Sequence, residues 1–177
     1  MTADLKIRAA APEDLPRLTA IYNHYIRDTH STFDTREFSV PQRQAWFDRF
    51  RPGTRHTLLV GIANDTVVGY ASSQPLRPKP AYDRSVETTV YLAPDCAGHG
   101  HGRLLYEALL SLLTDLGSVH RAYGVIALPN EASVHLHESL GFHRCSVLSE
   151  VGYKFGRYWD TAWYELHLSD NVSRSPE

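Results

Sequence analysis

Residues 90–106, VYLAPDCAGHGHGRLLY, indicate the fold of this chain more clearly than any other stretch. The run 90–93 is apolar and predicts a β-strand, and the leucines from Leu104 onward predict an amphipathic helix. Between them, Gly98, Gly100 and Gly102 alternate where the helix begins. Glycine lets the backbone approach a ligand and leaves the first helical N–H groups open. Because these groups lie at the positive end of the helix dipole, we expect the phosphate or pyrophosphate of a cofactor to bind here.

Two common phosphate-binding patterns do not fit this turn. A Walker loop requires G-x-x-x-x-G-K-[ST], and no Lys followed by Ser or Thr stands here. A dinucleotide fingerprint requires G-x-G-x-x-G near the start of a βαβ unit. The spacing here is G-x-G-x-G, and the strand lies in the middle of the chain. A glycine-rich turn without a ligand is the structural alternative.

The composition is typical of a globular enzyme. The chain has 177 residues, 42% of them hydrophobic, which suffices for the core of one domain. Its net charge of -2 and the lack of a basic run argue against a nucleic-acid partner. No apolar stretch approaches the roughly 18 residues of a bilayer-spanning helix, and the first residues, MTADLK, lack an apolar signal region. We therefore expect a cytoplasmic protein without a membrane partner.

The two cysteines and ten histidines raise the question of a disulfide or a metal site. In the cytoplasm both cysteines are expected to be free thiols. The closest groups are Cys96, His99 and His101 in the glycine turn, and His135, His137 and His143 further on. Neither group has the paired C-x2-C or H-x3-H spacing of zinc ligands, so no metal is expected.

The predicted elements alternate between strands and helices. Periodicity and turn residues predict strands at 6–8, 57–63, 66–71, 87–93, 123–128, 144–151 and 159–167, with helices beginning at 12 and spanning 41–50, 102–116 and 130–140. Loops are expected at 28–39 and at the proline-rich stretch 75–80. Because nothing indicates a second domain, we expect one domain over residues 1–169 and a polar tail at 170–177.

Several separate segments resemble the GNAT superfamily of N-acetyltransferases, most closely its phosphinothricin and methionine sulfoximine acetyltransferases. The turn at 97–102 is similar to the family's Q/R-x-x-G-x-G/A loop, except that Ala97 stands where Gln or Arg is usual. Further similar segments are IRAA (7–10), IYNHY (21–25), QAWF (44–47), NEASVHLHESLGF (130–142) and GYKFGRYWD (152–160). The resemblance implies the α/β GNAT fold: a central, mixed, largely antiparallel twisted sheet flanked by helices, with two central strands that splay apart.

The resemblance also implies acetyl-CoA as cosubstrate. Its pyrophosphate is expected on the loop amides and its pantetheine arm beside the splayed strands, and the backbone N–H of Tyr91 or Leu92 is the candidate donor to the thioester oxygen. His137 stands where related enzymes often have Tyr, and we favour packing and cofactor contact over proton donation to the leaving sulfur. The residues expected to bind acetyl-CoA are Val90, Tyr91, Leu92, Gly98, His99, Gly100, His101, Gly102, Arg103, Asn130 (also a plain N-cap), Ser133 and His137.

Acetyl transfer to an amine requires that the amine first lose a proton, because an amine with a pKa of about 8 to 10 is mostly protonated at neutral pH. Glu87 matches the glutamate that the subfamily places near the substrate amine. We expect Glu87 to accept that proton directly or through a water, a contribution of roughly 10²–10⁴-fold in rate. An exposed carboxylate at a strand edge is the structural alternative. No general acid is evident.

An amino-acid substrate presents a carboxylate, which an arginine fork holds well. Arg77 matches the subfamily's substrate-contacting loop, although a solvated loop residue explains it equally well. The residues expected to contact substrate are Arg77, Lys79, Thr88 and Thr89. Phe33 and Tyr82 are candidates for the walls of the pocket.

The expected function is acetyl-CoA-dependent N-acetylation of a small-molecule amine of the phosphinothricin, methionine sulfoximine or methionine sulfone type. The alternatives are a peptide or protein amine as substrate, and a CoA-binding module without catalysis, which Ala97 favours. The subfamily usually forms dimers, so a homodimer is expected. Six aromatic residues near the C-terminus either offer surface for it or fill the core: Tyr153, Phe155, Tyr158, Trp159, Trp163 and Tyr164.

Overall fold

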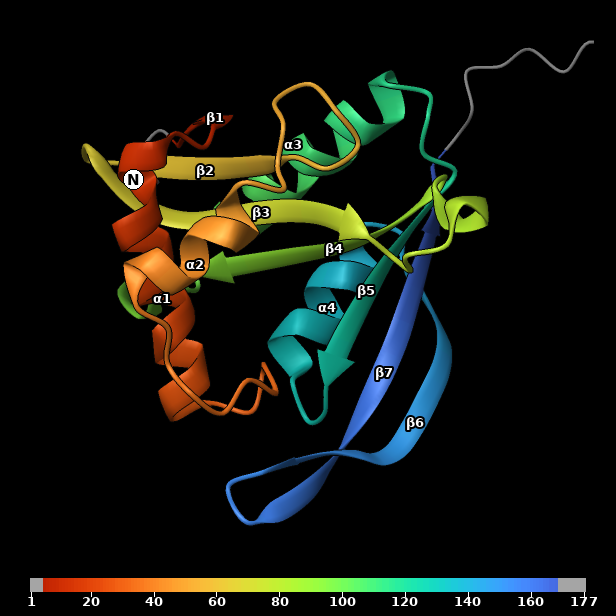
Figure 1. Cartoon of the computed structure of the whole chain (residues 1–177). Helices are drawn as coiled ribbons and strands as arrows, with labels where there is room; N and C mark the ends of the chain where they lie inside the picture. Colours follow the sequence, from red (N-terminus) through yellow and green to blue (C-terminus); the bar gives the residue numbers. More distant parts are fainter. Residues whose placement is uncertain (1–4, 169–177) are drawn as a thin grey trace, which may run out of the picture.

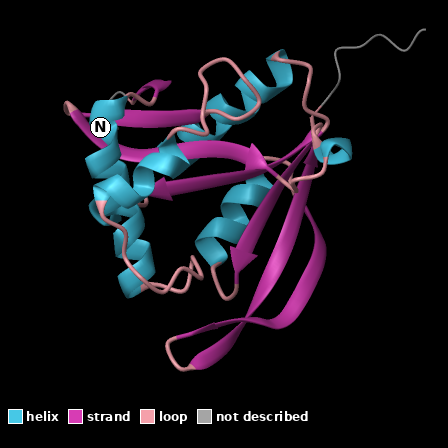
Figure 2. Cartoon of the chain, viewed as in Figure 1, coloured by secondary structure: helices cyan, strands magenta, loops and turns pink. Residues whose placement is uncertain are grey.

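The computed structural model describes residues 5–168, which form one seven-stranded sheet with helices on both faces (Figures 1 and 2). The strand order is β1-β2-β3-β4-β5-β7-β6, and every neighbouring pair is antiparallel except β4 and β5. The strands are β1 Lys6–Ala9, β2 Leu58–Ala63, β3 Thr66–Pro75, β4 Ser85–Leu92, β5 Arg121–Ala127, β6 His143–Lys154 and β7 Arg157–His167. The helices are α1 Leu15–Asp28, α2 Val40–Phe47, α3 His101–Asp115 and α4 Glu131–Ser139.

The order of strands and helices is the predicted one, with small differences at the ends of elements. The turn between β2 and β3 is formed by Asn64 and Asp65 with φ of 48° and 57°, as a tight hairpin requires. The second helix ends three residues before the predicted position, and β4 begins at Ser85, two residues earlier than predicted. The predicted polar tail at 170–177 lies outside the described residues.

Each face of the sheet has its own hydrophobic core. On one face α1 packs against β2, β3 and the chain after β4, through a cluster that includes Leu18, Ile21 and Tyr70. On the other face, α3 supplies Leu105 and Leu109 to a larger cluster that reaches β5 and β7. Neighbouring residues of one strand pack into opposite cores, because successive side chains point to opposite faces of the sheet. Among the described residues, no helix is long and apolar enough to cross a membrane.

The sheet opens in its middle, where β4 and β5 diverge (Figure 1). These two parallel strands pair over only three rows, which join Ser85, Val86 and Glu87 of β4 to residues 121–123 of β5. The remainder of each strand stays paired on its outer side, with β3 and with β7. The predicted splay of two central strands is therefore present, and it begins directly after Glu87.

Candidate active site

The gap between β4 and β5 exposes main-chain groups of β4. The Ala93 N–H donates to the Val68 carbonyl at 2.8 Å, in register with the β3–β4 ladder. Because residues of an antiparallel strand face their neighbour alternately, the polar backbone groups of Tyr91 are directed toward β3 and those of Val90 and Leu92 toward the gap. Of the two backbone donors that the sequence left open, Leu92 fits the gap, whereas the Tyr91 N–H is used within the sheet.

The opposite side of the gap is built in the same way. The Leu168 N–H donates to the His120 carbonyl at 3.1 Å, in register with the β5–β7 ladder. By the same alternation, the backbone groups of Val125 and Ala127 face β4. The gap therefore has free peptide groups along both walls, which suits an extended ligand that carries amides of its own.

The glycine turn places the start of α3 at one end of this gap. Gly98 and Gly100 both have φ of 81°, a conformation that residues with side chains rarely adopt. A Cβ on either glycine would have no heavy atom within 4 Å, so the backbone of the turn is open. Gly100 is the N-cap of α3, and the N–H groups of the residues that follow, His101–Arg103, have no helical acceptor. This geometry suits a phosphate group.

The side chains of the turn are placed differently from one another. His99 is exposed, whereas His101 is buried and neither of its ring nitrogens has a hydrogen-bond partner among the described residues. The exposed Arg103 donates to the Ser139 hydroxyl at 3.1 Å and pairs with Glu107 at 2.8 Å. Its guanidinium is therefore engaged by the protein, while its backbone N–H belongs to the open first turn.

The start of α4 lies near the same gap. The Asn130 side chain caps α4 by accepting the Ser133 N–H at 3.1 Å, as predicted, and it donates to Ser31 at 3.4 Å. His137 is buried beneath β5, where a Cβ on Gly124 would collide with its Nε2. Its Nδ1 lies 2.8 Å from the Ser133 carbonyl and its Nε2 lies 3.1 Å from the Tyr106 hydroxyl. With both nitrogens engaged, His137 packs under the sheet.

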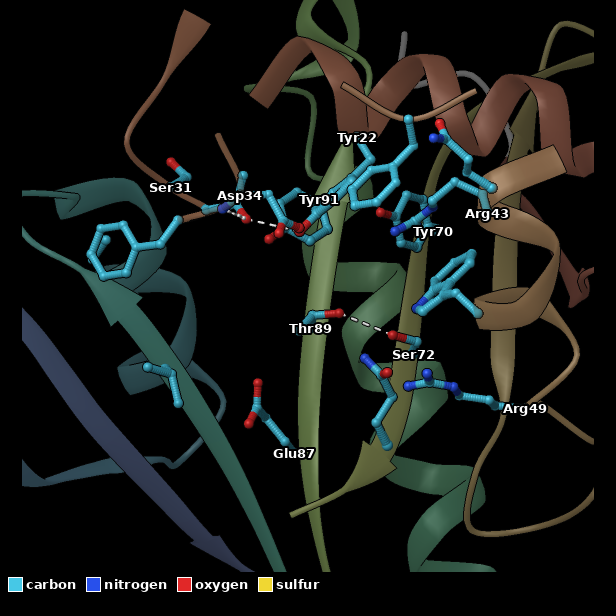
Figure 3. Close-up of a pocket in the computed structure, with 18 of the residues that line it drawn as sticks. Tyr22, Ser31, Asp34, Arg43, Arg49, Tyr70, Ser72, Glu87, Thr89 and Tyr91 are labelled. Atoms are coloured by element: carbon cyan, nitrogen blue, oxygen red, sulfur yellow. Dashed lines mark hydrogen bonds between the residues drawn. The ribbon is translucent and has the colours of Figure 1, made fainter. Parts of the chain in front are cut away.

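A cavity of about 490 Å³ lies on the α1–α2 face of the sheet, beside the gap (Figure 3). A cavity of this size fits a small metabolite. Alternate residues of β3 and β4 form its floor, and α1, α2 and the loop between them form its walls. The lining residues are Tyr22, Ser31, Thr32, Phe33, Asp34, Phe38, Gln42, Arg43, Ala45, Trp46, Arg49, Tyr70, Ser72, Gln74, Glu87, Thr89, Tyr91, Val125, Ala127 and Thr161.

Glu87 is the carboxylate on the floor of this cavity at the apex of the splay. It occupies the last row that β4 shares with β5, opposite Tyr123, and its side chain faces the cavity. Burial raises the pKa of Glu87 above its ordinary value, and the positive charge of Arg77 partly opposes that increase. A carboxylate with a raised pKa, placed in a cavity, is suited to accept a proton near neutral pH.

The four predicted substrate residues have different surroundings. Thr89 lines the cavity and its hydroxyl lies 3.0 Å from that of Ser72. Thr88 is 1% exposed and points to the opposite face, with its hydroxyl 2.7 Å from that of Tyr106. The expectation that Thr88 contacts substrate is wrong for this geometry, because adjacent residues of a strand face opposite ways. Arg77 and Lys79 are exposed and lie outside the cavity lining.

Aromatic residues predicted from the sequence also divide between the site and other places. Phe33 lines the cavity and packs over Gly152, whereas Tyr82 is exposed and does not line it. Tyr164 fills the core, while Tyr153 remains exposed on the β6–β7 hairpin. Sequence reasoning therefore identified one of the two proposed pocket walls.

A cluster of tyrosines closes the upper part of the cavity, of which the sequence predicted only Tyr91 as a site residue, in contact with the cofactor. Tyr22, Tyr70 and Tyr91 pack against one another, with ring centroids 5.3 Å apart for Tyr22–Tyr91 and 5.6 Å apart for Tyr70–Tyr91. The Tyr22 hydroxyl donates to Asp34, and burial together with this carboxylate raises the pKa of Tyr22 to about 12. The Tyr22 hydroxyl therefore stays protonated at neutral pH and donates its hydrogen bond to Asp34.

The other residues that were missed come from α2 and from β3. Arg43 and Trp46 lie on α2, Arg49 follows that helix, and all three line the cavity. The alternation of Tyr70, Ser72 and Gln74 along β3 was the available signal, since polar side chains recur there on one face of an otherwise apolar strand. No such pattern in the sequence distinguishes Arg43 from a solvent-exposed arginine on a helix.

Comparisons with known proteins agree with this geometry. A family model described as an acetyltransferase (GNAT) domain matches residues 7–163. A phosphinothricin N-acetyltransferase of Streptomyces coelicolor is 48% identical over 169 residues, which cover 94% of this chain and 98% of that protein. An L-methionine sulfoximine/L-methionine sulfone acetyltransferase of Pseudomonas paraeruginosa is 37% identical over 168 residues, 94% of this chain and 96% of that protein.

A solved structure has the same arrangement of elements. A GNAT superfamily phosphinothricin acetyltransferase from Sinorhizobium meliloti, in complex with acetyl-CoA, matches with a TM-score of 0.90 and 29% identity. The match covers 100% of this chain and 94% of that one. The fold class expected from the sequence is confirmed by this likeness together with the strand order.

Proposed function

Because the chain belongs to the GNAT family of acetyltransferases, we propose that it transfers the acetyl group of acetyl-CoA to the amine of a small amino acid analogue. Phosphinothricin, methionine sulfoximine and methionine sulfone are the substrate class. The observation that carries the proposal is the position of Glu87, a carboxylate with a raised pKa on the floor of a small cavity, at the point where β4 leaves β5.

The residues around the gap fit acetyl-CoA. The open amides that follow Gly100 at the start of α3 suit its pyrophosphate. The peptide groups of Val90 and Val125 that face the gap suit the amides of its pantetheine arm. When bound there, acetyl-CoA supplies the thioester whose acetyl group is transferred. Relatives with acetyl-CoA bound support this assignment.

Within this proposal, Glu87 makes the amine reactive. A substrate ammonium ion that enters the cavity meets this carboxylate and loses its proton to it, directly or through a water. The neutral nitrogen then attacks the thioester carbonyl, a C–N bond forms, and the C–S bond breaks. CoA leaves as a thiolate, which takes up the second proton that the nitrogen loses. The hydroxyl of Thr89, two residues further along the same face of β4, is placed to hold the amine in position.

Negative charge that develops on the carbonyl oxygen requires a hydrogen-bond donor. The Leu92 N–H is the candidate, because the ladder directs it into the gap. The carbonyl of the same residue, Leu92, accepts the Tyr25 hydroxyl at 2.8 Å, and this bond holds the backbone beside the N–H in place. A donor that is fixed before the reaction does not have to reorganise during it.

A thiol-release assay with acetyl-CoA and mass spectrometry of the products tests the proposal. The panel is phosphinothricin, methionine sulfoximine, methionine sulfone, ordinary amino acids and short peptides. Mono-acetylation of the first three compounds is the expected result. Acetylation of peptides alone contradicts the substrate class. Acetyl-CoA binding without thiol release for any amine contradicts the proposed catalysis and leaves a CoA-binding module.

We extend the proposal to a homodimer through the β6–β7 hairpin. Its tip carries exposed apolar residues, among them Val151, Tyr153, Phe155 and Tyr158. Single exposed apolar residues are common, but a contiguous group favours an interface. Sedimentation equilibrium is expected to give twice the mass of the chain, and Tyr158→Glu is expected to give monomers. The cytoplasmic location stays a prediction from composition.

A further inference from the structure

Arg43 is a buried cation on the wall of the cavity. It lies on α2, is 6% exposed, and its Nε and Nη2 atoms have no hydrogen-bond partner among residues 5–168. Figure 3 shows its guanidinium and that of Arg49 turned toward the cavity from the α2 side. Asp34 lines the same cavity, but its carboxylate accepts the Tyr22 hydroxyl, and no ion pair joins it to Arg43 within the described part of the chain.

The surroundings of Arg43 hold the cation without neutralising it. Its guanidinium carbon lies 3.7 Å from the ring centroid of Trp46 and 4.4 Å from that of Tyr22. Aromatic faces attract a cation, and this attraction offsets part of the cost of burial. The charge itself and the two N–H groups are left without an anion, which is unfavourable in a buried place. An oxyanion that enters the cavity supplies what is missing.

The β3–β4 register places Arg43 at the end of the cavity away from Glu87. Glu87 lies opposite Gln74, and four residues further along β4, Tyr91 lies opposite Tyr70, whose side chain is next to Arg43. Four residues correspond to about 14 Å along a strand, part of which the long arginine and glutamate side chains close. In an amino acid, each carboxylate oxygen is three bonds from the amine nitrogen. The phosphinate oxygens of phosphinothricin are five bonds away, and they reach further toward Arg43.

We propose that Arg43, assisted by Arg49, binds an oxyanion at the distal end of the substrate side chain and so makes the enzyme prefer phosphinothricin to neutral analogues. This inference rests on the proposed function, in which Glu87 receives the amine at the opposite end. A guanidinium suits a phosphinate, because its planar fork donates two parallel hydrogen bonds. Arg77, which is exposed near Glu87, is then left for the carboxylate of the substrate.

Phosphinothricin and methionine sulfone form a matched pair of substrates for the test. Their methyl-phosphinate and methyl-sulfone groups have nearly the same shape, but only the phosphinate is charged. The experiment measures kcat and KM for both compounds with the unaltered enzyme, Arg43→Met, Arg43→Lys and Arg49→Gln, at saturating acetyl-CoA. Arg36→Gln is the control, since it removes the same charge from an exposed loop position.

Arg43→Met is expected to raise the KM for phosphinothricin by about 10- to 100-fold, which is the loss of affinity expected when a charge-assisted hydrogen bond is removed. The KM for methionine sulfone should change by less than about threefold, and the KM for acetyl-CoA should not change. Arg43→Lys, which keeps the charge but not the fork, should fall between. Equal increases for both substrates, or no increase for either, overturn the proposal.

Two further measurements separate the possible reasons for failure. If Arg43→Met does not fold, as thermal unfolding would show, Arg43→Lys and Arg49→Gln decide the question by the same ratio of KM values. If the unaltered enzyme acetylates neither compound, the proposed function fails. Calorimetry with CoA present then measures binding alone, and equal or undetectable binding of the two compounds overturns the assignment of Arg43 as well.

Discussion

The two halves of the site are built from different chemical groups. The glycine turn and the β4–β5 gap present main-chain N–H and C=O groups, from one contiguous stretch and two strand edges. The cavity beside them presents side chains from α1, α2, β3, β4 and the loops between them. The backbone half therefore depends on conformation, whereas the side-chain half depends on individual residues. Substitutions in the two halves should have correspondingly different effects.

The largest effect is expected in the side-chain half, at Glu87. Glu87→Gln keeps the shape of the side chain but removes the proton acceptor, so kcat should fall by roughly 10²–10⁴-fold. The KM for acetyl-CoA should not change, because the amides of the other half are untouched. Steady-state kinetics with phosphinothricin measures both values. Full activity across the pH range would show that Glu87 is not the base.

The raised pKa of Glu87 also sets the direction of a pH effect. A carboxyl group with a raised pKa stays protonated, and therefore inactive as a base, to a higher pH than an ordinary glutamate. The acid limb of kcat/KM should thus lie above the usual glutamate range, and activity should rise with pH through it. Arg77→Gln removes the charge that opposes the increase and should move the limb to still higher pH. If the acid limb of Arg77→Gln lies at the same pH as that of the unaltered enzyme, the charge of Arg77 does not lower the pKa of Glu87.

A smaller effect is expected beneath the gap, where packing supports both halves. A Cβ at Gly124 would collide with His137 Nε2, so Gly124→Ala forces the ring to move. The free energy of unfolding should fall by about 1–3 kcal/mol, as for other overpacked cores. Urea denaturation measures this loss. In the His137→Ala background, which removes the ring, the same glycine substitution should cost much less.

In the backbone half, conformation should matter more than side chains. Gly100→Ala places a side chain at φ of 81°, a strain of about 1–2 kcal/mol, and should raise the KM for acetyl-CoA by about 5- to 30-fold. Gly53→Ala is the matched control, because it has φ of 72° and equally open surroundings in a distant turn. If both substitutions leave the KM unchanged, the turn does not hold the cosubstrate.

The smallest effect is expected from a side chain of that same turn. His99 is exposed, and in the proposed site only its backbone is used. His99→Ala should therefore change the KM for acetyl-CoA by less than about threefold, within the range of ordinary surface substitutions. A tenfold increase would show that the imidazole itself contacts the cosubstrate. The glycine turn would then bind through a side chain as well as through its backbone.

The same distinction explains what the sequence revealed. The glycine turn was predictable because Gly98, Gly100 and Gly102 occupy every second position within five residues, and glycine has few reasons to alternate at a helix start. Glu87 was identified by resemblance, although its place at the last paired row became visible only in the sheet register. Thr88 was assigned to the wrong face because the strand begins at Ser85 and its phase was unknown.

The cavity wall was missed for a physical reason. Arg43 is seventeen residues before Val60, which lies in the next apolar strand of the sequence. Its side chain is buried because the fold brings the rings of Tyr22 and Trp46 against it. A single arginine on a short helix normally predicts a solvated side chain. Its role depends on contacts between α1, α2 and β3, and no local pattern records these contacts.

The most direct test of the two-part site is a crystal structure of the protein with CoA and phosphinothricin. The two-part site predicts the pyrophosphate at the N–H groups that follow Gly100 and the pantetheine between β4 and β5. It also predicts the substrate amine beside Glu87 and the phosphinate toward Arg43. Pantetheine outside the gap, or an amine remote from Glu87, would contradict the account.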